Sequence, residues 1–136
     1  LHYPLRRQRQ MCIRDRFFSH DMEKIAVIDW QLVMKNLPGY DLAYLLFSNI
    51  DIDLRRNIFE ECCKRYLLGL KGRNLNLSHD ELHKNMMYSL MAQTIVPVNG
   101  GANFDLENQR SRKLFEVIAD RMFSAIEDYD ATSYIG

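Results

Sequence analysis

From residue 54 onward, apolar residues recur at the three-to-four-residue spacing of amphipathic helices. The spacing predicts a first helix over residues 54–70, with Asp53 before it as the expected cap. We expect this helix to be largely buried. One face holds Leu54, Ile58, Cys62 and Tyr66, with Phe59, Cys63, Leu67 and Leu70 beside them.

Two more helices are predicted after a loop over residues 71–77 that is rich in Gly and Asn. Ser78 and Glu81 have the spacing of a capping box, which opens a helix carrying Leu82, Met86, Met87, Leu90 and Met91. We expect Pro97, Asn99, Gly100 and Gly101 to end it. The last helix covers roughly residues 106–130, and the methionines, at helical spacing, are expected to fill the core.

Before residue 54 the pattern changes to a short hairpin and a turn. Phe17 and Phe18 and the apolar run 25–28 predict two strands joined by a polar turn over residues 20–24. The second strand runs directly into Asp29, and Pro38-Gly39 then predicts a turn that opens a helix with Asp41 in its first turn. Each carboxylate thus sits at the end of an element that apolar neighbours hold in place.

These two segments together resemble the aminoglycoside phosphotransferase and choline kinase superfamily of small-molecule kinases. The resemblance covers roughly residues 17–132 and rests on Asp29-Trp30 and on Pro38-Gly39-Tyr40-Asp41-Leu42-Ala43, which match the D-W/F-x and P-x-x-D-L-A motifs of that superfamily. Gln31 after the tryptophan is most similar to the ecdysteroid-kinase-like branch. The fold implied is mainly α: the helical carboxy-terminal lobe of a protein-kinase-like fold, with one short β-hairpin near its amino terminus.

The resemblance implies the roles of both aspartates. Asp29 falls on the position that binds the Mg²⁺ of ATP, a hard ion that one or two carboxylates and the nucleotide phosphates coordinate. Asp41 falls on the aspartate that braces the catalytic loop, which is a structural role, with Trp30 and Gln31 as motif neighbours of Asp29. The implied activity is transfer of the γ-phosphate of ATP to a hydroxyl group of a small molecule. The alternative for both residues is ordinary capping of a turn or helix in a non-catalytic helical binding or scaffold domain.

The sequence contains no H-x-D-x-x-x-x-N catalytic loop and no glycine-rich phosphate loop. Residues 1–16 carry five arginines without amphipathic periodicity and resemble a translated adapter sequence at a broken gene end. We therefore expect residues 1–16 to be non-native and residues 17–136 to be a partial kinase-like carboxy-terminal lobe, without its amino-terminal lobe and inactive alone. The alternative for residues 1–16 is a basic arm that binds nucleic acid or membrane.

Composition adds few constraints. Without residues 1–16 the chain has 13 basic and 17 acidic residues, so its charge gives no reason to expect nucleic acid as a partner. No apolar run approaches the length of a membrane span, and three cysteines, two of them adjacent, suit a reducing compartment. We expect a cytoplasmic protein that binds neither nucleic acid nor membrane.

The acceptor pocket and the stability of the chain are less constrained. The helix 54–70 and residues 96–104 are candidates to line the pocket, where acidic groups would meet a cationic acceptor or simply face solvent. Those groups are Asp51, Asp53, Glu60 and Glu61. His79 and His83, one helical turn apart, lack a zinc-protease motif and are expected on a surface helix. Loss of a lobe would leave apolar residues uncovered, and the candidates are Phe17, Phe18, Trp30 and Tyr44.

Overall fold

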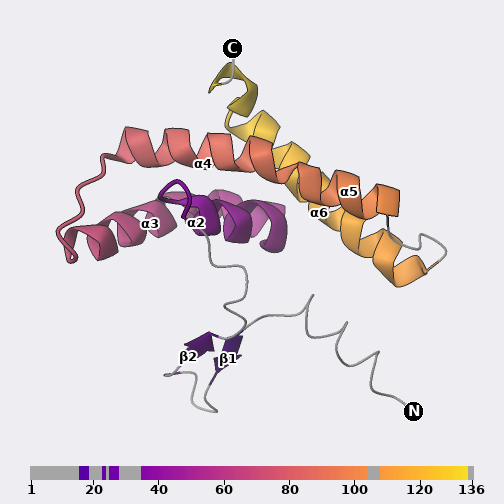
Figure 1. The fold of residues 1–136 in the computed structure, drawn as a ribbon, viewed down its shortest axis with the longest axis horizontal. Coiled ribbons are helices and arrows are strands. Elements are labelled where there is room, and N and C mark those ends of the chain that lie inside the picture. Colours follow the sequence, from indigo (N-terminus) through magenta and orange to yellow (C-terminus); the bar gives the residue numbers. More distant parts are fainter. Residues whose placement is uncertain (1–15, 19–22, 24, 28–34, 104–107, 135–136) are drawn as a thin grey trace. The chain divides into compact units, whose positions relative to one another are not determined.

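The computed structural model describes residues 16–18, 23, 25–27, 35–103 and 108–134. The chain divides into two units, residues 1–35 and residues 36–136. The first unit contains strands β1 (Arg16–Phe18) and β2 (Ile25–Val27), which pair antiparallel with Phe17 opposite Ala26 (Figure 1). The predicted hairpin is confirmed as this ladder, while most of the turn joining the strands lies outside the described residues.

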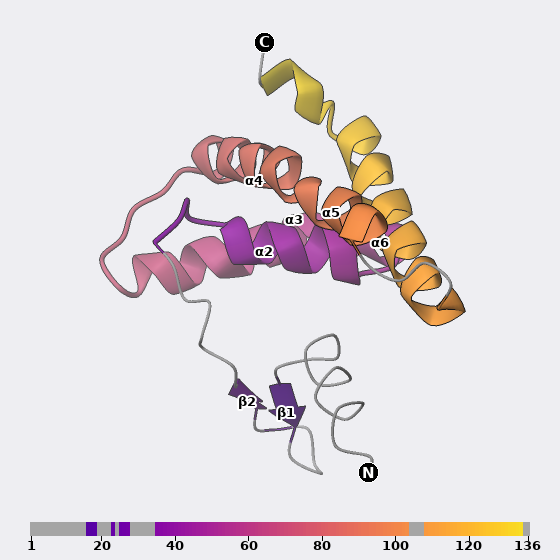
Figure 2. The same cartoon turned by 45° about the vertical axis from the view of Figure 1, so that its right-hand side comes forward.

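The second unit is helical, and Figures 1 and 2 show its helices from two directions. Helix α2 packs against α4, and α5 lies along α6. The elements in chain order are α2 (Tyr40–Tyr44), the π-helical turn η2 (Leu45–Asn49), α3 (Ile52–Lys71), α4 (His79–Gln93), α5 (Ile95–Asn103), α6 (Gln109–Asp128) and the 3₁₀ turn η3 (Ala131–Tyr134). The mainly α fold class predicted from the sequence is confirmed.

The core of the helical unit forms between η2, α3, α4 and α6. Phe47 and Phe59 stack at 6.0 Å between ring centroids, and Phe59 lies 4.5 Å from the ring of Tyr129. The predicted core role of the methionines is confirmed for those that are fully buried, Met86, Met87 and Met122. Burial of such side chains contributes about 1.5–3 kcal/mol each to stability, so this cluster is the main source of stability of the unit.

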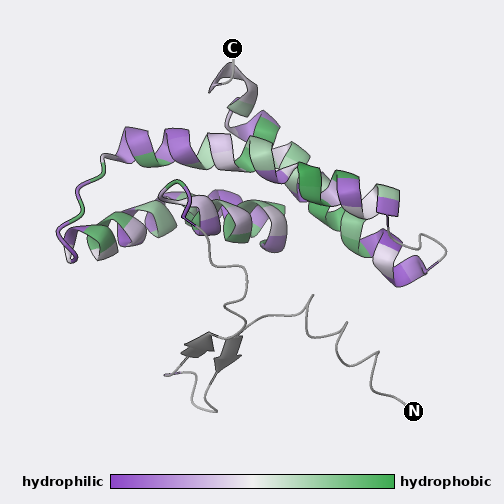
Figure 3. Cartoon of the chain, viewed as in Figure 1, coloured by the Kyte–Doolittle hydropathy of each residue, from purple (hydrophilic) through white to green (hydrophobic). Residues whose placement is uncertain are grey.

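Helix α3 differs from the sequence prediction in its capping residue and in its burial. Its cap is Asp51, whose Oδ1 accepts the Asp53 N–H at 3.2 Å, and Asp53 lies in the first turn. The buried face carries Arg55, Phe59 and Cys63, whereas Leu54 and several neighbours are exposed, so the helix is not largely buried. Figure 3 shows hydrophobic and hydrophilic residues alternating along α3, which is the pattern of a helix with one covered side.

The expected end of α4 at residues 97–101 was wrong. Helix α4 ends at Gln93, and residues 95–103 form the separate helix α5. Pro97 is tolerated because it is the third residue of α5, where a backbone N–H has no partner within the helix. Gly100 is needed there because a Cβ at this position would overlap the ring of Phe115 on α6. Gly100 therefore serves the packing of α5 on α6.

The capping box and the last helix agree with the sequence. Ser78 accepts the Glu81 N–H at 3.2 Å, and the Glu81 carboxylate accepts the Ser78 N–H at 2.9 Å. Helix α6 begins after Asn108, whose side chain accepts the N–H of Arg110 at 3.0 Å. Over the part of the chain that the structure describes, no helix combines the length and the apolar character that crossing a membrane requires.

Candidate functional site

Of the two predicted motif aspartates, the structure describes Asp41, which lies in the first turn of α2. Asp29, Trp30 and Gln31 lie outside the described residues. The described part of the site consists of the turn at residues 37–39 and the first turn of α2.

Gly39 fixes the turn before α2. Its φ of +93° lies in the left-handed region, which a residue with a side chain adopts only with strain. A Cβ at this position would also lie 2.6 Å from Cδ1 of Leu82 on α4. The Gly39 N–H donates to the Tyr66 hydroxyl at 2.8 Å, and its C=O accepts the Ala43 N–H at 2.8 Å. The backbone entering α2 is thus held by both α3 and α4.

A second contact holds the first residue of α2. Gln93, at the end of α4 and 1% exposed, donates from Nε2 to the Tyr40 C=O at 3.1 Å. Three residues further along, Ala43 is completely buried. One side of α2 is therefore fixed against α4, which leaves the other side free to present polar groups.

Asp41 is exposed on this fixed helix start. Within the described part of the chain its carboxylate has neither a hydrogen bond nor an ion pair. Its place in the first turn is favourable because backbone N–H groups at a helix start attract negative charge. The chemistry available is that of a rigidly placed hydrogen-bond acceptor.

A buried arginine, which the sequence analysis did not identify, links α3 and α6. Arg55 is fully buried and donates to the Arg121 C=O at 3.0 Å, to the Ser124 hydroxyl at 3.2 Å and to the Asp128 carboxylate. Arg56 holds the same carboxylate at 2.8 and 2.9 Å. The hydrogen bond from Arg56, with the charge of Arg55, lowers the pKa of Asp128 from its ordinary value. The sequence signal that could have identified Arg55 as a core residue is its position, four residues before Phe59 on the same face of α3.

The acidic residues considered for a cationic acceptor all have partners. Asp51 caps α3, Asp53 pairs with Arg56 at 3.3 Å and Glu60 contacts His79 at 3.1 Å. Glu61 pairs with Arg65 at 2.7 Å, and the hydrogen bond from Arg65 lowers the pKa of Glu61. This arrangement supports the interpretation that these residues form a solvated, internally paired face of α3.

The histidine pair is also accounted for by packing. His83 lies edge-on to Phe59 at 5.9 Å, and its Nδ1 is 3.2 Å from the Tyr134 hydroxyl. Burial, followed by the charge of His79, lowers the pKa of His83. No group of three or more His, Cys, Asp or Glu residues placed to hold a metal ion occurs among the residues described. The described part of the chain thus offers no metal centre of its own.

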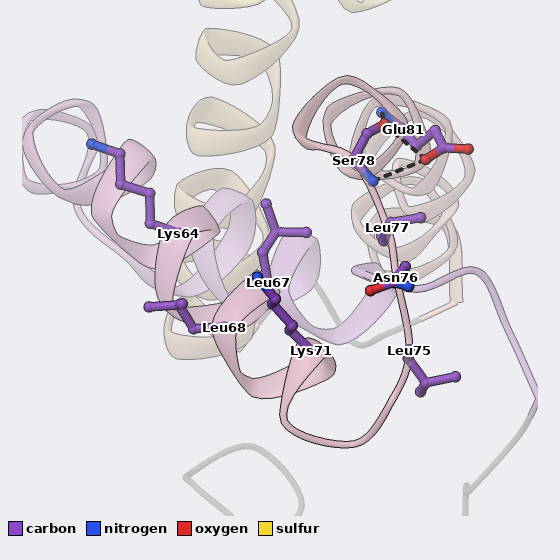
Figure 4. Close-up of a pocket in the computed structure, with 9 residues that line it drawn as sticks. All are labelled: Lys64, Leu67, Leu68, Lys71, Leu75, Asn76, Leu77, Ser78 and Glu81. Atoms are coloured by element: carbon purple, nitrogen blue, oxygen red, sulfur yellow. Dashed lines mark hydrogen bonds between the residues drawn. The ribbon is translucent and has the colours of Figure 1, made fainter.

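An open hollow of about 670 Å³ lies between the end of α3 and the start of α4 (Figure 4). Leu67, Leu75 and Leu77 supply apolar surface, and Lys71 and Glu81 are at its edge. Two oxygens of the capping box also border it, and both already form hydrogen bonds there. The hollow therefore has mainly apolar walls, with Lys64, Lys71 and Asn76 as further polar groups in its lining.

The fold and the start of α2 define a helical lobe in which a fixed helix presents Asp41. Residues 16–79 match the sequence model of the ecdysteroid kinase-like family, and this segment includes both aspartate motifs. The predicted branch is confirmed. No curated protein and no solved structure gives a significant match to the chain.

Proposed function

We propose that this chain is part of the helical lobe of an ATP-dependent kinase that phosphorylates a hydroxyl group of a small molecule. The observation that carries the proposal is the family match over residues 16–79, within which Asp41 lies on a helix start fixed by α3 and α4. The family match supports kinase-like chemistry, and the geometry suits the bracing role of Asp41. The proposal places the catalytic loop and the amino-terminal lobe in sequence outside these 136 residues.

In this proposal Asp29 is the Mg²⁺ ligand. A carboxylate suits Mg²⁺, which takes oxygen ligands and needs only one or two from the protein when ATP phosphates supply others. Bound Mg²⁺ and ATP supply the transferable phosphoryl group and neutralise its charge. Asp41 acts at a distance from this chemistry: its carboxylate holds the backbone of the catalytic loop in register with Asp29.

The experiment uses the full-length protein encoded at the source locus, purified and supplied with Mg·ATP. Phosphoryl transfer is measured with three acceptors: an ecdysteroid, choline and an aminoglycoside. Phosphate release from ATP is measured separately without an acceptor. Asp29→Asn should abolish Mg²⁺-dependent turnover, and Asp41→Asn should lower kcat by about 10²-fold, the typical effect of small misplacement. Asp80→Asn, on the exposed first turn of α4, is the matched control and should leave turnover unchanged.

The 136-residue chain alone should give no phosphoryl transfer. Turnover by the chain alone, tracking with the protein through purification, would contradict the assignment of catalysis to sequence outside it. Full activity of the Asp29→Asn protein would contradict the metal-ligand role.

A further inference from the structure

The hollow at the junction of α3 and α4 has apolar walls that are open to water. Two leucines from α3 and two from the segment before α4 line it: Leu67, Leu68, Leu75 and Leu77. Figure 4 shows Leu67 and Leu77 on its two sides. Leu68 is 69% exposed and Leu75 is 56% exposed, so a ligand here would remove apolar surface from water. The volume of about 670 Å³ lies within the range of small-molecule sites, about 300–1,000 Å³.

Two lysines stand on the α3 side of this hollow. Lys64 and Lys71 are seven residues apart, with Leu67 and Leu68 between them, and this spacing places all four on one face of the helix. Seven residues advance about 10 Å along a helix, so the lysines flank an apolar strip about two turns long. Lys71 lies in the last turn, where a cation suits the helix dipole, but Lys64 has no such role.

Among the described residues, no carboxylate forms an ion pair with either lysine. Glu61 is paired with Arg65, whose hydrogen bond is the main cause of its lowered pKa, and the charge of Lys64 adds a minor effect. Glu81, the acidic residue in the lining, accepts the Ser78 N–H at 2.9 Å and the Ser78 hydroxyl at 2.7 Å. The described lining thus carries two cations and one carboxylate that is engaged in helix capping, so its charge favours an anionic ligand.

We propose that the hollow binds the anion of a free fatty acid, with its aliphatic chain against the four leucines and its carboxylate paired with Lys64 or Lys71. The walls suit an aliphatic chain better than a polyol, because Asn76 supplies the one side-chain amide among the described residues that line them. The lysines favour a carboxylate over a neutral alcohol of the same length, since hydrogen bonds between ionised groups are the stronger ones. Fatty-acid binding at this site is separate from phosphoryl transfer, so the failure of one leaves the other standing.

The test titrates the 136-residue chain with decanoate, below its micelle-forming concentration, in a calorimeter. Decanol is the neutral ligand of equal chain length. Decanoate should bind at one site per chain and at least tenfold more tightly than decanol. The double variant Lys64→Gln with Lys71→Gln should weaken decanoate binding at least tenfold and change decanol binding less than twofold. Lys113→Gln, at an exposed lysine on α6, is the matched control and should leave both affinities unchanged.

A second pair of variants tests the apolar walls. Leu68→Ser with Leu75→Ser should weaken the binding of both ligands at least tenfold, and the melting temperature should stay unchanged because both side chains are exposed. Val98→Ser on α5, at a side chain that is 60% exposed, is the control. A spin-labelled fatty acid should broaden the NMR methyl signals of Leu68 and Leu75 and leave those of Val98 sharp.

The proposal is wrong if decanoate shows no saturable binding, or if it binds the lysine double variant as tightly as the wild type. Equal weakening by Lys113→Gln would also contradict it, because the fatty acid would then adsorb to any basic surface. Binding of the chain to vesicles of anionic lipid, with none to monomeric decanoate, would overturn it in favour of a membrane-docking surface.

Discussion

Removing the Asp128 carboxylate should strongly destabilise the helical unit, because it leaves the guanidinium of Arg55 buried without a counter-charge. Arg55 is fully buried, while the side chain of Asp128 is 23% exposed. Loss of one partner of a buried ion pair costs about 3–5 kcal/mol, and the partial access of water favours the lower end of this range. We therefore take a loss of about 3 kcal/mol. At about 4–8 °C per kcal/mol for a unit of this size, Asp128→Ala should lower the melting temperature by roughly 12–24 °C.

The assay is thermal and urea unfolding of the chain at pH 7, followed by circular dichroism. Asp120→Ala is the matched control, since Asp120 is exposed on the same helix and has no hydrogen bond or ion pair within the described residues. The double variant Arg55→Met with Asp128→Ala should recover most of the loss, because an apolar side chain replaces the uncompensated charge. An Asp128→Ala protein within about 0.5 kcal/mol of wild type, the usual range for surface substitutions, would refute the reasoning.

Three further predictions test other parts of the fold. Gly39→Ala should destabilise the unit by about 1–3 kcal/mol in urea unfolding, because φ is +93° and the added Cβ meets α4; a neutral effect would show that the turn can relax. Ser78→Ala should cost about 0.5–2 kcal/mol in the same assay through loss of the capping box, with the exposed Ser133→Ala as the comparison. The lowered pKa of His83 means that the unfolded chain binds its proton more readily, so the contribution of His83 to stability is complete above pH 6.5 and declines as pH falls from there toward the folded pKa. Unfolding measured between pH 5 and 7.5 checks the sign, and His83→Gln should remove that part of the pH dependence.

The sequence predicted elements wherever local chemistry determined them. The capping box at Ser78 and the Pro38-Gly39 turn before Asp41 are short-range signals, and the structure has both. Pro97 misled the prediction because a proline and two glycines usually end a helix, whereas here the proline lies in the first turn of a new one. The local pattern cannot distinguish the end of one helix from the start of another when the contact that decides between them is made with α6, further along the chain.

Long-range contacts also explain what the sequence did not reveal about the site. The motif around Asp41 identified the residue, but its fixed position depends on Tyr66 and Gln93, which are 27 and 53 residues from the backbone groups that they contact. Arg55 was not recognised as a core residue because a charged side chain is buried only where partners from other helices surround it. Spacing along one helix carries no information about those partners.

The most direct test of the central claim is the DNA sequence upstream of the codon for Phe17, read through the source locus. The proposed function predicts an H-x-D-x-x-x-x-N loop before the hairpin of β1 and β2, preceded by a lobe that carries a lysine for ATP. A genuine start codon at the beginning of residues 1–16, with no lobe before it, would contradict the kinase assignment and favour a helical binding domain.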